Sequence, residues 1–63
     1  MNKLKTMRKA INLTQEALAK RAGISYRAYQ NYESGERVPN AYVAVLIAKA
    51  LNSSVEEIFS TND

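Results

Sequence analysis

Apolar side chains recur along the chain with the period of an α-helix. The first of them follow the i, i+3, i+4, i+7 spacing and predict an amphipathic helix whose inward stripe is Leu4, Met7, Arg8 and Ile11. Asn12 tolerates the left-handed conformation and is placed to end this helix. Arg8 is a charged residue on an apolar stripe, so it requires a partner within the fold.

A second and a third helix follow with a very short joint between them. Thr14 offers an N-cap hydroxyl, and Gly23 ends a helix whose buried stripe is Leu18, Ala19 and Ala22. Ser25 caps a third helix over about residues 26–33, which stops at Ser34 and Gly35. Two helices joined by a turn of about three residues, with Gly at its start, predict a helix-turn-helix.

The residues after Gly35 predict a loop and a fourth helix. Pro39 keeps Val38 out of the helical region, and Asn40 can cap a helix over residues 41–51 that Asn52 ends. The spacing assigns its inward stripe to Ala41, Ala44, Ile47, Ala48 and Leu51.

Ser54 and Glu57 have the spacing of a capping box, which opens a short fifth helix carrying Ile58 and Phe59. Neither a strand pattern nor a linker interrupts the chain. We therefore predict one compact five-helix all-α domain over residues 1–63, with the helix-turn-helix at about residues 15–34 and the last four residues frayed.

The composition excludes most catalytic chemistry. The 63 residues contain no Cys and no His, which excludes zinc ribbons, thiol nucleophiles and imidazole bases. We expect no enzyme activity, no metal and no cofactor. The longest apolar stretch, residues 41–48, is much shorter than the roughly 18 residues of a membrane span, and the start of the chain lacks a signal-peptide pattern. We therefore expect a cytoplasmic protein that does not bind membranes.

Positive charge is concentrated in the first part of the chain. The net charge is +3, and residues 1–37 hold eight of the nine Lys and Arg residues but three of the six Asp and Glu residues. A split of this kind is common on solvated surfaces, and it also suits a polyanionic partner.

In the segment QEALAKRAGISYRAYQNYES, which begins at Gln15, small and apolar residues stand at positions that the crossing of two helices constrains sterically. Where two helices cross, Ala19 must be small to accommodate Tyr29, and Gly23 must accept a positive φ. Ile24, Tyr29 and Tyr32 are placed to fill the wedge between the helices.

On these residues the sequence resembles the lambda-repressor-like helix-turn-helix domains of phage repressors, Cro proteins and XRE-type transcriptional regulators. The resemblance covers nearly the whole chain, through the segments LKTMR, LTQEALAKRAGIS, YESGERVPN and IAKALNSSVEEIF. It implies that the second helix lies across the phosphate backbone of B-DNA while the third enters the major groove.

A rotation of about 100° per residue turns Ala28, Tyr29 and Tyr32 inward and leaves four side chains on the outer face of the third helix. These are Tyr26, Arg27, Gln30 and Asn31. The resemblance implies that they face base edges, where Arg27 suits guanine, Asn31 suits adenine, and Tyr26 suits a thymine methyl or a sugar. A plain solvated helix face is the alternative.

The resemblance also implies phosphate contacts at the start of the second helix and on either side of the third. The residues are Gln15, Ser25, Ser34, Arg37 and Asn40. Free N–H groups and the helix dipole near Gln15 favour an anion. Ser25 and Asn40 are equally suited to be ordinary helix caps, a role that needs no DNA.

For Arg8 the resemblance supplies Glu33 as a partner. We expect a buried or half-buried ion pair that locks the first helix onto the third, and we expect its role to be structural.

The predicted fourth helix is also apolar on its outer face. Tyr42, Val45 and Leu46 project there together with Lys49, and large apolar groups on an outer face are unusual for a monomer. We hypothesise a two-fold homodimer interface on this face, edged by Ile58 or Phe59. Scattered surface hydrophobics are the alternative.

Together these inferences predict a sequence-specific transcriptional regulator, a repressor that binds a palindromic double-stranded DNA operator as a homodimer. Its own concentration, proteolysis or a partner protein would regulate it. The alternative is a protein–protein interaction module, antitoxin-like, with the same fold and little DNA affinity. The low net charge and the acidic Glu36 beside Arg37 favour that alternative.

Overall fold

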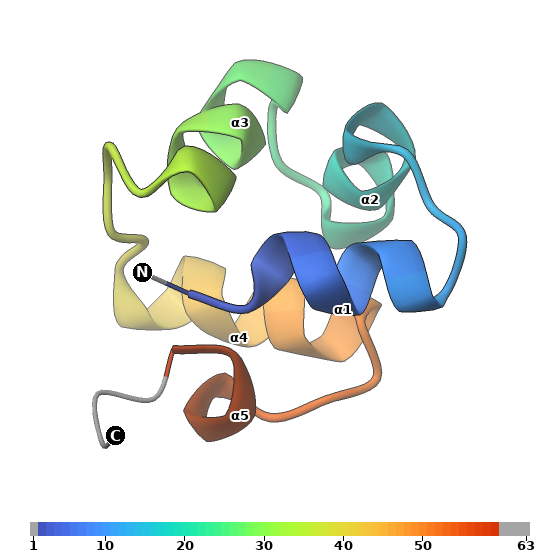
Figure 1. Ribbon diagram of the computed structural model, residues 1–63. Coiled ribbons are helices and arrows are strands. Elements are labelled where there is room, and N and C mark those ends of the chain that lie inside the picture. Colours follow the sequence, from blue (N-terminus) through green and yellow to red (C-terminus); the bar gives the residue numbers. More distant parts are fainter. Residues whose placement is uncertain (1, 60–63) are drawn as a thin grey trace.

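Five α-helices follow one another in the computed structural model, which describes residues 2–59 (Figure 1). They are α1 (Leu4–Ala10), α2 (Gln15–Ala22), α3 (Tyr26–Ser34), α4 (Ala41–Ala50) and α5 (Val55–Phe59). No strand occurs in this range, so the all-α prediction is confirmed. The predicted fraying of the last four residues lies outside the described residues.

The helices begin at the residues that the capping pattern predicts. Thr14 Oγ1 accepts a hydrogen bond from the backbone N–H of residue 17 at 3.0 Å, and Ser25 Oγ accepts one from residue 28 at 3.0 Å. Asn40 Oδ1 accepts from residue 43 at 2.8 Å, and Ser54 and Glu57 exchange the two bonds of a capping box, each 3.1 Å long. Each cap satisfies a backbone donor that the helix cannot satisfy itself.

The left-handed residues lie where the sequence predicts helix ends. Gly23 has a φ of 77°, and its N–H and that of Ile24 close the end of α2 by bonding to the carbonyls of residues 20 and 19. A Cβ on Gly23 would meet no atom within 4 Å, so the positive φ is what requires glycine there. Asn12 and Asn52 also have positive φ, 59° and 55°.

Each helix contributes one large side chain that is almost completely buried: Leu4, Leu18, Tyr29, Ile47 and Ile58. Two residues of the predicted inward stripes are exposed instead. Ile11, 41% exposed, follows the last residue of α1, where the helical rotation no longer sets its direction. Ala41, the first residue of α4, is also exposed, whereas the later members of its stripe are buried.

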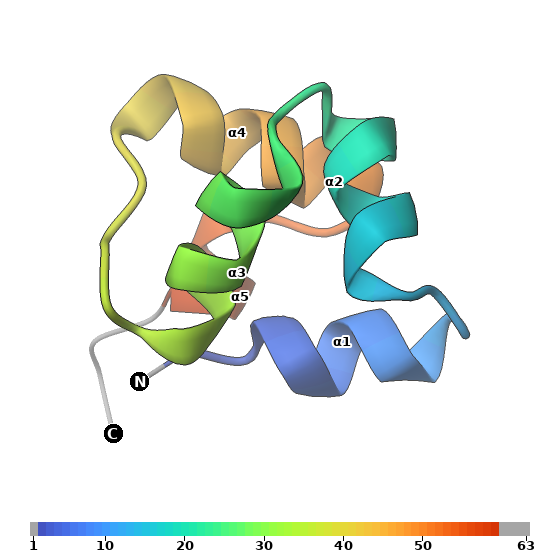
Figure 2. The same cartoon turned by 90° about the horizontal axis from the view of Figure 1, so that it is seen from above.

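α2 and α3 form one side of the molecule, α5 lies on the opposite side, and α1 and α4 lie between them (Figure 1 and Figure 2). In Figure 1, α2 and α3 lie at the top, α5 lies at the bottom, and α1 crosses in front. α2 packs against both α3 and α4, and α5 packs against α4. The N–H of Lys3 donates to the carbonyl of Ile58 at 3.1 Å and ties the start of α1 to α5. Figure 2 looks onto the side formed by α2 and α3.

Candidate nucleic-acid interface

The turn between α2 and α3 consists of residues 23–25. Gly23 is left-handed and Ser25 is extended, with φ −71° and ψ 151°, so the chain reverses direction within three residues and enters α3 at Tyr26. Ile24 packs half-buried against the core between the two helices. This geometry is that of a helix-turn-helix, whose second helix presents its outer face to solvent.

The outer face of α3 carries the four side chains that the sequence assigned to base reading. Tyr26 and Arg27 are exposed and Gln30 and Asn31 are partly exposed, whereas Tyr29 on the inner face is completely buried. Within residues 2–59, none of the four outward side chains makes a hydrogen bond to the protein. Their donors and acceptors are therefore available to a ligand.

The residues assigned to phosphate contacts on either side of α3 are all exposed. Three of them already bond the backbone: Ser25 and Asn40 as caps, and Ser34 through the carbonyl of Asn31 at 3.1 Å and the N–H of Glu36 at 3.3 Å. The side chain of Arg37 makes no hydrogen bond within the described residues. Arg37 is the one charged residue of this set, and within residues 2–59 it forms no ion pair.

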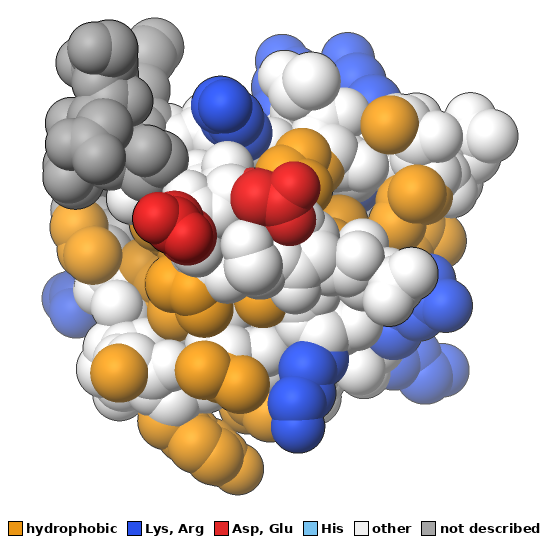
Figure 3. Space-filling model, turned by 90° about the horizontal axis from the view of Figure 1, so that it is seen from below, with side chains coloured by type: hydrophobic (Ala, Val, Ile, Leu, Met, Phe, Trp, Pro, Cys, Tyr) orange, Lys and Arg blue, Asp and Glu red, His pale blue; other side chains and the backbone are white. Residues whose placement is uncertain are grey.

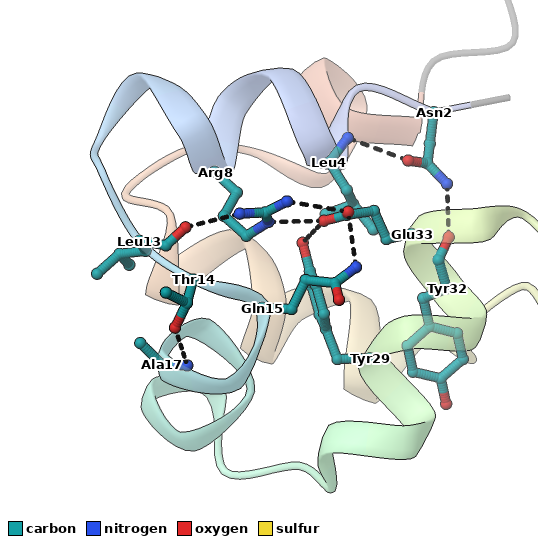
Figure 4. Close-up of polar contacts among 10 residues, drawn as sticks. All are labelled: Asn2, Leu4, Arg8, Leu13, Thr14, Gln15, Ala17, Tyr29, Tyr32 and Glu33. Atoms are coloured by element: carbon teal, nitrogen blue, oxygen red, sulfur yellow. Dashed lines mark hydrogen bonds and ion pairs between the residues drawn. The ribbon is translucent and has the colours of Figure 1, made fainter.

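Gln15, the first residue of α2, is held differently. Its side-chain Nε2 donates to Glu33 Oε2 at 2.8 Å, so the amide is directed toward α3 (Figure 4). Among the described residues, the backbone N–H groups of Gln15 and Glu16 have no acceptor. The positive end of the helix dipole therefore remains open to an anion through the backbone.

The ion pair between Arg8 and Glu33 is present, and it is nearly buried, with side chains 10% and 7% exposed. Arg8 Nε lies 2.8 Å from Glu33 Oε1, and Nη2 lies 3.1 Å from Oε2. The third guanidinium nitrogen donates to the carbonyl of Leu13 at 2.7 Å. Arg8 therefore joins α1 to α3 and to the loop that leads into α2.

Two further side chains, those of Tyr29 and Gln15, donate hydrogen bonds to the carboxylate of Glu33. Tyr29 donates its hydroxyl to Glu33 Oε1 at 2.6 Å, beside the amide of Gln15 on Oε2. The sequence analysis missed both. The spacing of Tyr29 and Glu33, four residues apart on one helix, places them on one face and offered a signal, whereas Gln15 offered none.

This network keeps Glu33 ionised. Burial alone raises the pKa of Glu33, but the hydrogen bonds from Arg8, Tyr29 and Gln15 outweigh burial and lower the pKa to about 2. Burial, with the neighbouring carboxylate, raises the pKa of Tyr29. The hydrogen bond to Glu33 raises the pKa of Arg8. The pair is therefore fully charged near neutral pH.

Comparison with known sequences agrees with this geometry. A sequence profile described as helix-turn-helix matches residues 4–58. The chain belongs to the lambda-repressor-like helix-turn-helix family. The match covers all five helices except the last residue of α5, and relatives of this chain are named as transcriptional regulators.

Several members of the family are similar over most of this chain. The cryptic phage CTXphi transcriptional repressor RstR of Vibrio cholerae is 46% identical over 89% of this chain, which spans about half (50%) of that protein. An HTH-type transcriptional regulator of Methanocaldococcus jannaschii is 42% identical over 98% of this chain and 94% of its own length. One from Archaeoglobus fulgidus is 37% identical over 90% of this chain and 80% of its own.

The outer face of α4 carries mainly apolar side chains, as the sequence predicts. Tyr42 is 73% exposed, Val45 and Lys49 are exposed, and Leu46 is partly exposed. Phe59 is half-buried against the core, but Ile58 is completely buried and cannot edge an interface. Figure 3 looks onto the side opposite α2 and α3, where hydrophobic side chains lie together with acidic and basic ones.

Three other observations concern the described part of the chain. Val38, in the loop before α4, is a strongly exposed apolar side chain that was not predicted from the sequence. Within residues 2–59 no three carboxylates come together as metal ligands would. No helix in that range has both the length and the apolar character needed to cross a bilayer.

Proposed function

We propose that this chain represses transcription by binding a palindromic double-stranded DNA operator as a homodimer, with α3 in the major groove. One observation carries the proposal. Directly after a helix-turn-helix turn, the outer face of α3 presents Arg27, Gln30 and Asn31 with no hydrogen bond to the described protein. The name of RstR, a transcriptional repressor, supports repression as the direction of control.

The base contacts follow from the chemistry of these side chains. Arg27 donates two hydrogen bonds to the O6 and N7 of guanine, and Asn31 pairs with the N6 and N7 of adenine. Gln30 lies beside them, and the exposed ring of Tyr26 contacts a thymine methyl. Each bidentate contact discriminates between bases by about 1–3 kcal/mol.

Phosphate contacts position α3 in the groove. The open backbone N–H groups of Gln15 and Glu16 bind one strand at the start of α2. Ser25 binds beside them, and Ser34, Arg37 and Asn40 bind the backbone on the far side of the groove. These contacts fix the register and carry no sequence information.

A second copy of the chain covers the outer face of α4. Tyr42, Val45 and Leu46 form the centre of the two-fold interface, with Lys49 and Phe59 at its edge. With the two-fold axis perpendicular to the duplex, the two recognition helices face the same side of DNA about 34 Å apart, one helical turn. Sedimentation that detects only monomer at high micromolar concentration would contradict this arrangement.

Selection of bound duplexes from random DNA tests the proposal. An inverted repeat should be enriched, and the logarithm of its affinity should fall linearly with the logarithm of salt concentration, with a slope near −0.9 per neutralised phosphate. If no sequence is enriched and affinity for DNA stays negligible at low salt, the protein-interaction alternative replaces this proposal, with the exposed Val38, Tyr42 and Val45 as its binding surface.

A further inference from the structure

Gln15 and Glu33 form a second connection between the two helices of the helix-turn-helix. The first connection is the turn over residues 23–25, which joins the end of α2 to the start of α3. The second joins the opposite ends, because Gln15 begins α2 and Glu33 is the last residue but one of α3. Its hydrogen bond, from Nε2 to Oε2, is 2.8 Å long (Figure 4). α2 and α3 are therefore fastened to each other at both ends.

The chemistry of the carboxylate fixes how Gln15 is held. An ionised carboxylate only accepts hydrogen bonds, so the amide nitrogen of Gln15 and not its oxygen must face Glu33. Arg8 holds both oxygens of the same carboxylate through hydrogen bonds of 2.8 and 3.1 Å, and Tyr29 adds a bond of 2.6 Å that lies within α3. Since the pair with Arg8 fixes the acceptor, the bond from Gln15 restrains the first turn of α2 relative to α3.

Reading bases requires this restraint more than binding phosphates does. Base contacts demand side chains placed within about 0.5 Å of the productive geometry, whereas phosphate binding is dominated by charge and tolerates small changes of angle. We infer that Gln15 is a positioning residue. Its amide, through Glu33, sets the angle between α2 and α3 at which contacts to the DNA phosphates and contacts to the bases form together. The inference rests on the DNA binding proposed above and gives the Gln15 side chain a role other than contacting phosphate.

A pair of variants separates this role from others. Gln15→Met removes the donor and keeps the length of the side chain. Tyr29→Phe is the matched control, because it removes one hydrogen bond to the same carboxylate but Tyr29 and Glu33 both lie on α3. The affinity of each variant is measured for the duplex selected by the wild-type protein and for a random-sequence duplex of equal length. Both measurements are made at one salt concentration and well below the melting temperatures of the variants.

Gln15→Met should lower affinity for the selected duplex about tenfold, the effect of losing or misaligning one base contact. It should change affinity for random DNA less than about twofold, and Tyr29→Phe should change neither.

Equal losses on both duplexes would mean that the amide itself contacts phosphate. Unchanged affinities would mean a purely structural role, and an equal loss of selectivity in Tyr29→Phe would mean a general loosening of the core. Each of these results overturns the inference. A wild-type protein that selects no duplex would instead remove the proposed function, so the two failures are distinguishable.

Discussion

All five helices share one apolar core, and within the described residues a buried polar network is added to it among α1, α2 and α3. On the side of α1, α2 and α3, one carboxylate, Glu33, receives hydrogen bonds from Arg8, Gln15 and Tyr29 and so connects all three helices. On the side of α4 and α5, every buried residue is apolar. Arg8 and Glu33, which form a nearly buried ion pair, both belong to the first of these groups.

The difference follows from what each kind of contact specifies. Apolar burial depends on area and is not directional, so it stabilises α4 and α5 without fixing an angle closely. Hydrogen bonds and ion pairs are directional, and a satisfied buried network specifies one arrangement of the groups that make it. In this domain the directional contacts add to the apolar core at the helices that are proposed to fit DNA, whereas the buried residues of α4 and α5 are apolar alone.

Removing the carboxylate should have the largest effect on stability. Glu33→Ala leaves the charge of Arg8 nearly buried and unpaired, which costs about 3–5 kcal/mol. A domain of this size loses about 4–8 °C of melting temperature per kcal/mol, so the transition should fall by at least about 12 °C. Thermal unfolding followed by circular dichroism measures the shift. A transition at the wild-type temperature would show that the ion pair does not hold α1 to α3.

Acid should weaken the same network without a mutation. The pKa of Glu33 in the folded protein, about 2, lies below the ordinary value of 4.5, so its contribution is complete above about pH 4.5 and is lost as pH falls toward 2. The shift corresponds to about 3 kcal/mol. Urea unfolding at pH 5 and pH 2.5 measures the loss, which should be much smaller in Glu33→Gln. An equal loss in that variant would assign the effect to other carboxyls, such as Glu57, whose pKa is also lowered by hydrogen bonds from Ser53 and Ser54.

The apolar side should respond more weakly and without dependence on pH. Ile47→Val removes one methylene from a completely buried position of α4 and should cost about 1 kcal/mol. The cost should be the same at pH 7 and pH 3, because no titratable group is involved. A cost that changes with pH in urea unfolding would mean that the ionisation of Glu33 affects the packing around Ile47.

The sequence predicted the helices, their caps and their ends well, because these depend on neighbouring residues. Helix capping by Thr14, Ser25 and Asn40, and the end of α2 at Gly23, depend on residues only a few positions away. The Arg8–Glu33 pair followed only from resemblance to a family, since no local pattern brings residues 25 positions apart together.

Other features depended on tertiary distances that the sequence does not contain. Helical rotation placed Ile11 and Ala41 inward, but the rotation applies only inside a helix and buries only residues that another element covers. The hydrogen bond from the side chain of Gln15 to Glu33 was not predicted from the sequence either. It depends on the distance between α2 and α3, which no periodicity specifies.

The central claim is that the outer face of α3 reads DNA, and Arg27→Ala tests it most directly. Its side chain is exposed and makes no hydrogen bond within residues 2–59, so its removal should leave the melting temperature unchanged, the smallest effect on stability predicted here. Lys3→Ala is the matched control, because it removes the same charge from an exposed side chain at the start of α1, which is tied to α5.

The measurement is the affinity of both variants for the duplex that the wild-type protein selects, and for duplexes with each base pair exchanged in turn. Arg27→Ala should bind the selected duplex about tenfold more weakly and lose its preference for guanine at one position of each half-site, while Lys3→Ala keeps that preference. If Arg27→Ala binds the selected duplex with wild-type affinity and wild-type base preference, α3 does not read DNA.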